Sequence, residues 1–227
     1  VDKEVTYRSK IYFTPLLSQT EIDAEKVKKI IEAEYKAAGM KPEDLQTGAV
    51  IITGETARKH NANTVLASLS SMAGDFVVAT AGPDLESVLS AKGAGADAFS
   101  EEHRQAVANI DIGGGTSNIA LFQKGNLKGT SCLDIGGRLI KIENGRISYI
   151  FPKIQKLAEA HGIHIAVGDR AEEAVLYKIC EYMADQLAMA IHAREADSLH
   201  AGLYTNDGKP LTSEPKIDAI TYSGGVA

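Results

Sequence analysis

The sequence is poor in the features that direct a chain to the secretory pathway, to membranes or to nucleic acid. It has only two cysteines, Cys132 and Cys180, and no Cys-x-x-Cys pair, which is typical of a reducing compartment. It has no patch of basic residues and a net charge of −6, which argues against binding to nucleic acid or to an anionic membrane. The uncharged stretch 64–74 is too short and too rich in serine to span a bilayer.

The overall composition is that of an ordinary soluble globular chain. Its 227 residues, 44% hydrophobic and 24% charged, are enough for one large packed domain or two small ones. No secretory signal peptide is recognisable. The chain starts at Val1 instead of Met and stops soon after a pair of glycines, so we expect a fragment truncated at both ends.

The first half alternates predicted strands and helices, which favours a parallel sheet with covering helices. Thr20 is the predicted N-cap of the first helix, and Gly39 is its predicted end. The stretch 91–105, small residues followed by charges, is the best candidate for a domain junction. The predicted elements are strands over 5–16, 49–54 and 75–82 and helices over 21–38, 55–72 and 83–92.

From residue 106 the pattern changes to consecutive strands separated by glycine-containing turns. Two helices follow, over 154–160 and 170–194, and then a strand over 217–225. The longer helix carries a predicted core stripe of Leu176, Ile179, Cys180, Met183, Leu187 and Ile191. The predicted fold class is therefore α/β, with two mixed-sheet domains over 1–105 and 106–227.

The most informative stretch is IDIGGGTSN, residues 110–118. Asp111 follows an apolar approach, and after three glycines the polar trio Thr116, Ser117 and Asn118 leads into the apolar run 119–122. Strands are predicted on both sides of this loop. That excludes a Walker A loop or a Rossmann turn, because both need a helix after the glycines.

The residue types in this loop suit phosphate binding. Glycines allow positive φ and a close approach of the backbone to a ligand, so that successive N–H groups form a nest for an anion. Thr116 and Ser117 add hydroxyl donors, and Asp111 can hold a hydrated Mg²⁺. An ordinary glycine-rich turn is the alternative. An unpaired aspartate on an apolar strand is costly, which favours a ligand site, but the residues alone leave both interpretations open.

Two motifs resemble those of the actin/Hsp70/sugar-kinase superfamily. IDIGGGTSNIALF resembles its phosphate-2 motif, and ITYSGGVA, near the end of the chain, resembles its adenosine motif. Three further stretches, YRSKIYFTPL, TGETARK and AGPDLESVLSAKGAGA, extend the similarity to the whole chain. In combination they are similar to the ethanolamine utilization protein A family, the reactivating factor of ethanolamine ammonia-lyase.

The resemblance implies an actin-like ATPase (ribonuclease H-like) fold and a chaperone-like factor. Such a factor uses ATP and Mg²⁺ to release damaged cobalamin from ethanolamine ammonia-lyase, its protein partner, so that intact adenosylcobalamin can bind. A cytoplasmic location is implied, while association with a bacterial microcompartment and formation of a homo-oligomer stay open. Carried over by position, the implied roles are Asp111 facing Mg²⁺ or the phosphates, Gly113, Gly114, Gly115 and Thr116 cradling the β- and γ-phosphates, Ser117 beside them, and Gly224 and Gly225 contacting adenosine.

The chain also departs from the superfamily pattern. The phosphate-1 motif, which should precede Val1, and the helix after the adenosine motif are absent, so ATPase activity is expected only of a full-length protein. Two alternatives therefore remain: a small-molecule kinase or phosphatase of the same superfamily, and a protein-binding module with an inactive nucleotide site. No catalytic residue is assigned. Asp84 and Glu86 are the candidates, but Asp84 also suits a helix N-terminus.

Asp-Ile-Gly-Gly occurs a second time, at 134–137, without a third glycine or the hydroxyls. We interpret Gly136 and Gly137 as a turn at the edge of the same site, and we expect them to matter less for nucleotide affinity than Gly114 and Gly115. The pair His161 and His164 is interpreted as a solvated loop and not as a metal site, because no third fixed ligand accompanies it.

Overall fold

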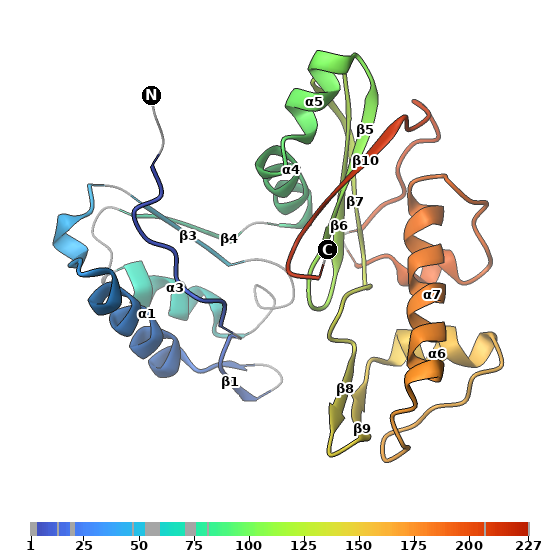
Figure 1. Cartoon of the computed structure of the whole chain (residues 1–227), viewed down its shortest axis with the longest axis horizontal. Helices are drawn as coiled ribbons and strands as arrows, with labels where there is room; N and C mark the ends of the chain where they lie inside the picture. Colours follow the sequence, from blue (N-terminus) through green and yellow to red (C-terminus); the bar gives the residue numbers. More distant parts are fainter. Residues whose placement is uncertain are drawn as a thin grey trace. The chain divides into compact units, whose positions relative to one another are not determined.

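The computed structural model describes residues 4–12, 14–18, 21–46, 48–52, 60–70, 76–80, 82–206 and 208–226 (Figure 1). The chain divides into two compact units, Val1–Gly82 and Pro83–Ala227. This division differs from the predicted one at 105/106. The predicted junction 91–105 is mostly helical, because it holds the end of α4 (Pro83–Gly93) and all of α5 (Ala96–His103), and both helices pack on the sheet of the second unit.

The first unit contains two pairs of strands and two α-helices. Strand β1 (Leu16–Ser18) pairs antiparallel with β2 (Glu21–Ile22), and β3 (Gly48–Ile52) pairs parallel with β4 (Phe76–Thr80). The helices are α1 (Ala24–Ala38) and α3 (Ala62–Ser70), with the short 3-10 helix η1 (Pro42–Asp44) after α1. Ile22, Ala62, Val65 and Leu69 form the core.

Two predictions for this unit need correction. The strand predicted over 5–16 is not formed in the described residues before Leu16; instead the hydroxyls of Tyr7 and Tyr12 donate to the Glu34 carboxylate on α1. The predicted cap Thr20 lies outside the described residues, as do residues 55–59, 71 and 72 of the helix predicted over 55–72. Asp23 caps α1, since its carboxylate accepts from the Lys26 N–H at 3.0 Å. Gly39 ends the helix as predicted, with φ of 68°.

A mixed four-stranded sheet dominates the second unit. Its order is β10-β5-β6-β7, formed by β5 (Ala106–Ile112), β6 (Ser117–Gln123), β7 (Asn126–Leu133) and β10 (Ala219–Ser223). β10 is parallel to β5, whereas β5, β6 and β7 are joined antiparallel. Lys124 and Gly125, with φ of 52° and 78°, make the tight turn between β6 and β7. The predicted α/β class is confirmed.

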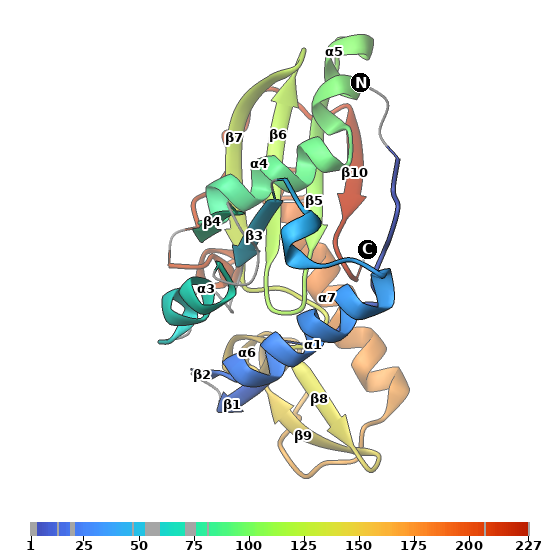
Figure 2. The same ribbon diagram turned by 90° about the vertical axis from the view of Figure 1, so that its left-hand side faces the viewer.

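Helices cover both faces of this sheet. Figure 2 shows α4 and α5 lying across one face, where Ala91 and Ala96 pack against Val107, Ala120 and Phe122. The other face packs against α7 (Glu173–Ala190), through a core that includes Ile110, Ile119, Leu121 and Leu187.

The rest of the second unit is a hairpin with helices beside it. Strands β8 (Ile140–Glu143) and β9 (Arg146–Ile150) turn at Asn144 and Gly145, and α6 (Pro152–Ala160), α7 and the 3-10 helix η2 (His200–Leu203) follow. Of the predicted stripe on α7, Ile179, Leu187 and Ile191 are buried. Cys180 is exposed, contrary to prediction, because it lies one residue, and so about 100° around the helix, from Ile179.

Candidate functional site

The glycine-rich hairpin stands at the carboxyl end of β5, the strand between β10 and β6. The Gly113 N–H donates to the Thr116 carbonyl at 3.0 Å, which closes the loop. In the sheet register Asp111 lies opposite Asn118 of β6 and beside Ser223 of β10. The end of β5 therefore brings the aspartate, the glycines and the final strand of the chain to one edge of the sheet.

Asp111 is half-buried and takes part in a line of polar side chains across β5 and β10. Its Oδ1 accepts from the Ser223 hydroxyl at 2.9 Å, and that hydroxyl accepts from the Asn109 amide at 3.0 Å. Asn109 Oδ1 in turn accepts from the Thr221 hydroxyl at 2.9 Å. Within the described ranges no Lys, Arg or His side chain makes an ion pair with Asp111. A positioned carboxylate without a cationic partner is a suitable ligand for a hard cation such as Mg²⁺.

Three segments distant in sequence are joined at this loop by backbone hydrogen bonds. The Gly137 N–H donates to the Gly113 carbonyl at 3.0 Å, and the Arg138 N–H donates to the Gly114 carbonyl at 2.7 Å. On the other side, the Val226 N–H donates to the Ile112 carbonyl at 3.2 Å. The second Asp-Ile-Gly-Gly stretch and the final Gly pair thus flank the first, as the sequence predicts.

Close approach explains the glycines at two of these positions. A Cβ on Gly136 would lie 2.6 Å from the Gly114 carbonyl group and 2.7 Å from the Gly115 nitrogen. A Cβ on Gly224 would lie 2.3 Å from the Ile112 carbonyl oxygen and 2.8 Å from Asp111 Oδ1, and Gly224 also has φ of +104°. A side chain at either position would force these segments apart.

The hairpin glycines behave differently from the expectation. Gly113, Gly114 and Gly115 are absent from the residues with positive φ, so the loop does not use the left-handed conformation that the sequence suggested. The three heavy atoms nearest to a Cβ built on Gly114 all belong to the Arg138 side chain, at 3.2 to 3.4 Å. Steric demand is therefore greater at Gly136 than at Gly114. The expected order of these glycines in nucleotide affinity is a separate matter and stays a prediction.

The polar trio after the glycines lies inside the sheet edge. Ser117 is fully buried, and its hydroxyl donates to the Ile135 carbonyl at 2.8 Å. Thr116 and Asn118 are also buried, and Asn118 Oδ1 has no hydrogen-bond partner in the described part of the chain. Because the Ser117 hydroxyl hydrogen is used within the protein, we expect Ser117 to hold the site together and the backbone N–H groups to face a ligand.

Sequence reasoning missed Asn109, Ser223 and Arg138. Asn109 and Ser223 reach Asp111 only because β10 pairs with β5, and that pairing joins residues 112 apart in the chain. Arg138 could have been found from the sequence, since it directly follows the second Gly pair. The gathered set of predicted site residues is Asp111, Gly113, Gly114, Gly115, Thr116, Ser117, Gly136, Gly137 and Gly224, with Gly225 next in the chain.

The other candidates make contacts with residues outside this loop. The Thr130 hydroxyl on β7 donates to the Asp84 carboxylate, and Lys209 Nζ lies 3.5 Å from its other oxygen. His161 stacks on Tyr182 with ring centroids 3.8 Å apart. The described residues contain no cluster of three or more His, Cys, Asp or Glu side chains able to hold a metal ion. Among the helices that the structure describes, none has the length and hydrophobicity needed to cross a membrane.

Fold and site together define the chain as an α/β protein built around a glycine-rich hairpin at the end of the central strand of a mixed sheet. The chain belongs to the family of ethanolamine utilisation protein EutA, whose model matches residues 1–227.

Two curated relatives are named ethanolamine ammonia-lyase reactivase EutA. The one from Salmonella typhimurium is 39% identical over 227 residues, and the one from Escherichia coli is 39% identical over 230 residues. Each alignment covers 100% of this chain and 48% of the relative, so the chain spans about half the length of both. Among solved structures, MreB5 of Spiroplasma citri bound to ADP is similar with a TM-score of 0.45 and 16% identity, over 94% of this chain and 67% of that one.

Proposed function

We propose that the chain is the nucleotide-binding part of an ATP-dependent reactivating factor for ethanolamine ammonia-lyase, with an actin-like ATPase fold. Membership of the EutA family and the names of the two relatives support the lyase as the partner. The observation that carries the proposal is the junction of three segments at one loop, where Asp111, the Gly113–Gly115 carbonyls and N–H groups, and the turn at Gly224 meet.

Each part of this junction matches one part of Mg·ATP. The N–H groups of the hairpin that remain outside the sheet are donors suited to phosphate oxygens. The Asp111 carboxylate would hold the hydrated Mg²⁺, which when bound neutralises charge on the phosphates. The turn at Gly224 and Gly225 has no side chains and would let adenosine lie against the backbone.

Reactivation needs more than tight binding of ATP. A ligand shifts an equilibrium only by its difference in affinity for the two states, so ATP must bind better to the conformation that opens the inactivated lyase. The loop is suited to this coupling because the 135–138 segment hydrogen-bonds to it, and because Val226, just after β10, hydrogen-bonds to Ile112 directly before it. A change at the phosphates would therefore reach two other segments. In this proposal the factor acts in the cytoplasm and releases the damaged cobalamin.

The test uses a protein of the relatives' full length and lyase inactivated with cyanocobalamin. Release of cyanocobalamin should require both ATP and Mg²⁺. Asp111→Asn removes the charge but keeps an acceptor for Ser223, and it should lower Mg·ATP affinity at least about tenfold and abolish release. The matched control is Asp97→Asn, because Asp97 lies on α5 with only a 3.8 Å contact to Lys92.

Three outcomes would contradict the proposal in different ways. Release without ATP would exclude the mechanism. Full release by the Asp111→Asn variant would favour a protein-binding module with an inactive nucleotide site. Turnover of a soluble phosphate acceptor in the absence of lyase would favour a small-molecule kinase or phosphatase.

A further inference from the structure

Arg138 is attached to the glycine-rich hairpin through its backbone. Its own N–H donates to the Gly114 carbonyl at 2.7 Å, and the N–H of the preceding residue, Gly137, donates to the Gly113 carbonyl at 3.0 Å. Two consecutive donors therefore bind two consecutive carbonyls of the loop. The Cα of Arg138 cannot move away from the hairpin unless both hydrogen bonds break.

The side chain of Arg138 returns over the same loop. A Cβ built on Gly114 would lie 3.2 Å from Arg138 Cδ and Nε and 3.4 Å from Cζ. The guanidinium group is therefore next to Gly114, and Arg138 is exposed. Gly114 and Gly136 are needed for different reasons. The missing side chain of Gly114 leaves space for the Arg138 side chain, whereas that of Gly136 leaves space for the backbone of the hairpin.

We propose that the Arg138 guanidinium is a ligand of the phosphate group bound by the hairpin, an inference that rests on the proposed function. The loop's other donors are neutral backbone N–H groups, and Asp111 adds a negative charge close to where the phosphates would lie. A bound phosphate group would add further negative charge, and Arg138 is a cation that the hydrogen bonds of the loop hold beside it.

Arginine suits this role better than lysine would. Its planar guanidinium keeps its charge at all relevant pH values and offers two parallel N–H donors to two phosphate oxygens. If Arg138 contacts the phosphates and not the base or ribose, a specific prediction follows. The contribution of Arg138 should be present for Mg·ATP and absent for adenosine.

The experiment measures binding by calorimetry on a protein of the relatives' full length, with Mg·ATP, Mg·ADP and adenosine as separate ligands. Arg138→Met should weaken Mg·ATP binding roughly 10- to 100-fold, the usual effect of losing hydrogen bonds to a charged group, and leave adenosine within about twofold. The Mg·ATP affinity of the Arg138→Lys variant should lie between those of the wild type and Arg138→Met. The control is Arg104→Met, because Arg104 is an exposed arginine at the end of α5.

A double-mutant cycle tests the geometry. Gly114→Ala keeps the backbone N–H and needs no left-handed φ, but its methyl group would displace the guanidinium. We expect it to weaken Mg·ATP binding in the wild-type background and to have little further effect beside Arg138→Met, because both changes remove one interaction.

The possible failures can be told apart. If wild-type protein binds Mg·ATP and Arg138→Met binds it equally well, the inference fails and the proposed function stands. If wild-type protein does not bind Mg·ATP, both fail. An equal loss of adenosine binding in Arg138→Met would assign the effect to a damaged pocket and would overturn a role in phosphate binding. Additive effects of Gly114→Ala and Arg138→Met would also contradict the geometry.

Discussion

Gly136 lies where two stretches of backbone come close together in the site. Gly136→Ala would bring a methyl carbon within 2.6 Å of the Gly114 carbonyl group, and backbone on both sides limits relaxation. We expect the free energy of unfolding to fall by about 1–3 kcal/mol, as in other overpacked sites. Mg·ATP affinity should fall as well, because the hairpin must move. Urea unfolding and calorimetry measure the two effects.

The matched control for this change is Gly202→Ala. Gly202 has no heavy atom within 4 Å of a built Cβ and no left-handed φ, so its substitution should leave both quantities nearly unchanged. If Gly136→Ala behaved like Gly202→Ala, the close packing of the 135–138 segment on the hairpin would be contradicted. The steric role of Gly136 could not be predicted from the sequence, because a contact with distant backbone leaves no mark on local composition.

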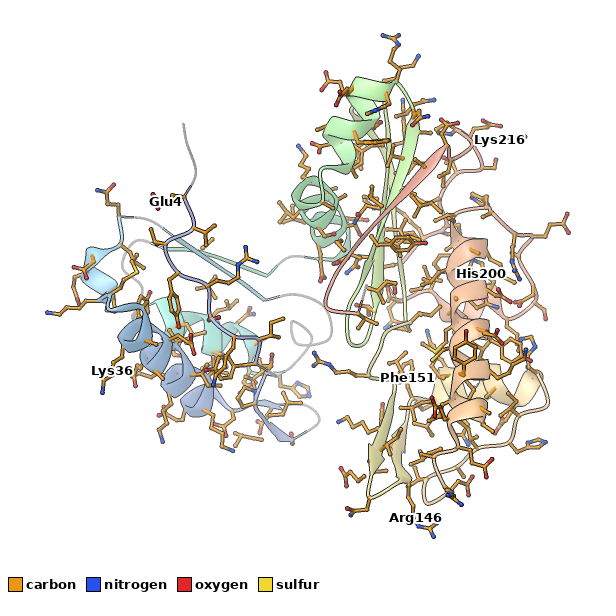
Figure 3. The ribbon with its side chains drawn as sticks, in the orientation of Figure 1. Glu4, Lys36, Arg146, Phe151, His200 and Lys216 are labelled. Carbon is orange, nitrogen blue, oxygen red and sulfur yellow. The ribbon has the colours of Figure 1, made fainter. Side chains whose placement is uncertain are left out.

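At the scale of the elements, hydrogen bonds between polar side chains, most of them buried, join η2 to α7. His200, which is labelled in Figure 3, belongs to this group. Its Nδ1 lies 2.9 Å from Gln186 Oε1, and its Nε2 lies 2.9 Å from the Tyr204 hydroxyl. The Gln186 amide donates to Asp197 at 2.7 Å, which directs its oxygen to the histidine. These partners suit a neutral imidazole that donates through Nδ1 and accepts at Nε2.

This arrangement predicts a pH dependence. Burial lowers the pKa of His200 below its ordinary 6.5, against the opposing effect of Asp197 and with a smaller lowering effect of His192. Above pH 6.5 both folded and unfolded chains hold a neutral imidazole and stability is full. As the pH falls below 6.5 the unfolded chain takes up the proton first, so stability decreases until the lower folded pKa is passed. Urea unfolding at a series of pH values above and below 6.5 measures it.

His200→Gln removes the titrating group and should flatten this part of the profile, whereas His164→Gln, in an exposed loop, should leave it unchanged. Asp197 titrates in a separate range. Burial raises its pKa, but hydrogen bonds from Gln186, Leu199 and His200 outweigh this and hold the pKa below 3.8. Its stabilising contribution is therefore lost only as the pH falls below 3.8. An unchanged slope in His200→Gln would contradict the assignment.

Much of the second unit could be predicted from local sequence. The tight turns at Lys124–Gly125 and Asn144–Gly145 follow from their residues, and the strands on either side were predicted. The stretch 91–105 was interpreted as a junction because its residues are small. In the structure Ala91 and Ala96 are fully buried, since small side chains let α4 and α5 approach the sheet closely. Composition alone does not separate a linker from a tight helix–sheet contact.

The residues of the site could be predicted, but the hydrogen bonds that join them could not. Asp111 and the glycines carry a motif, whereas the hydrogen bond from Ser223 to Asp111 depends on a strand pairing across 112 residues. The same holds for Arg138, whose position depends on two long-range backbone hydrogen bonds. Non-local pairing is specified by the packed whole and not by any local pattern.

The whole molecule consists of two units with separate cores. The first is packed around Ile22, Val65 and Leu69, and the second has three clusters of its own. We therefore expect residues 83–227 to fold cooperatively as an isolated chain, with coincident urea transitions by near- and far-UV circular dichroism. Gly136→Ala should lower the midpoint as much in this chain as in the complete one. Non-coincident transitions would contradict the independence of the second unit.

The pairing of β10 with β5 sets an order of events during synthesis of the protein. The hairpin leaves the ribosome well before its partner strand, because Ser223 follows Asp111 by 112 residues. At typical rates of roughly 5–20 residues per second, that interval is on the order of ten seconds. During it the nascent chain already has the glycine-rich loop but lacks the strand that orients Asp111. The nucleotide pocket that we propose is therefore incomplete until β10 has been made, and a nascent chain without β10 would not compete for ATP.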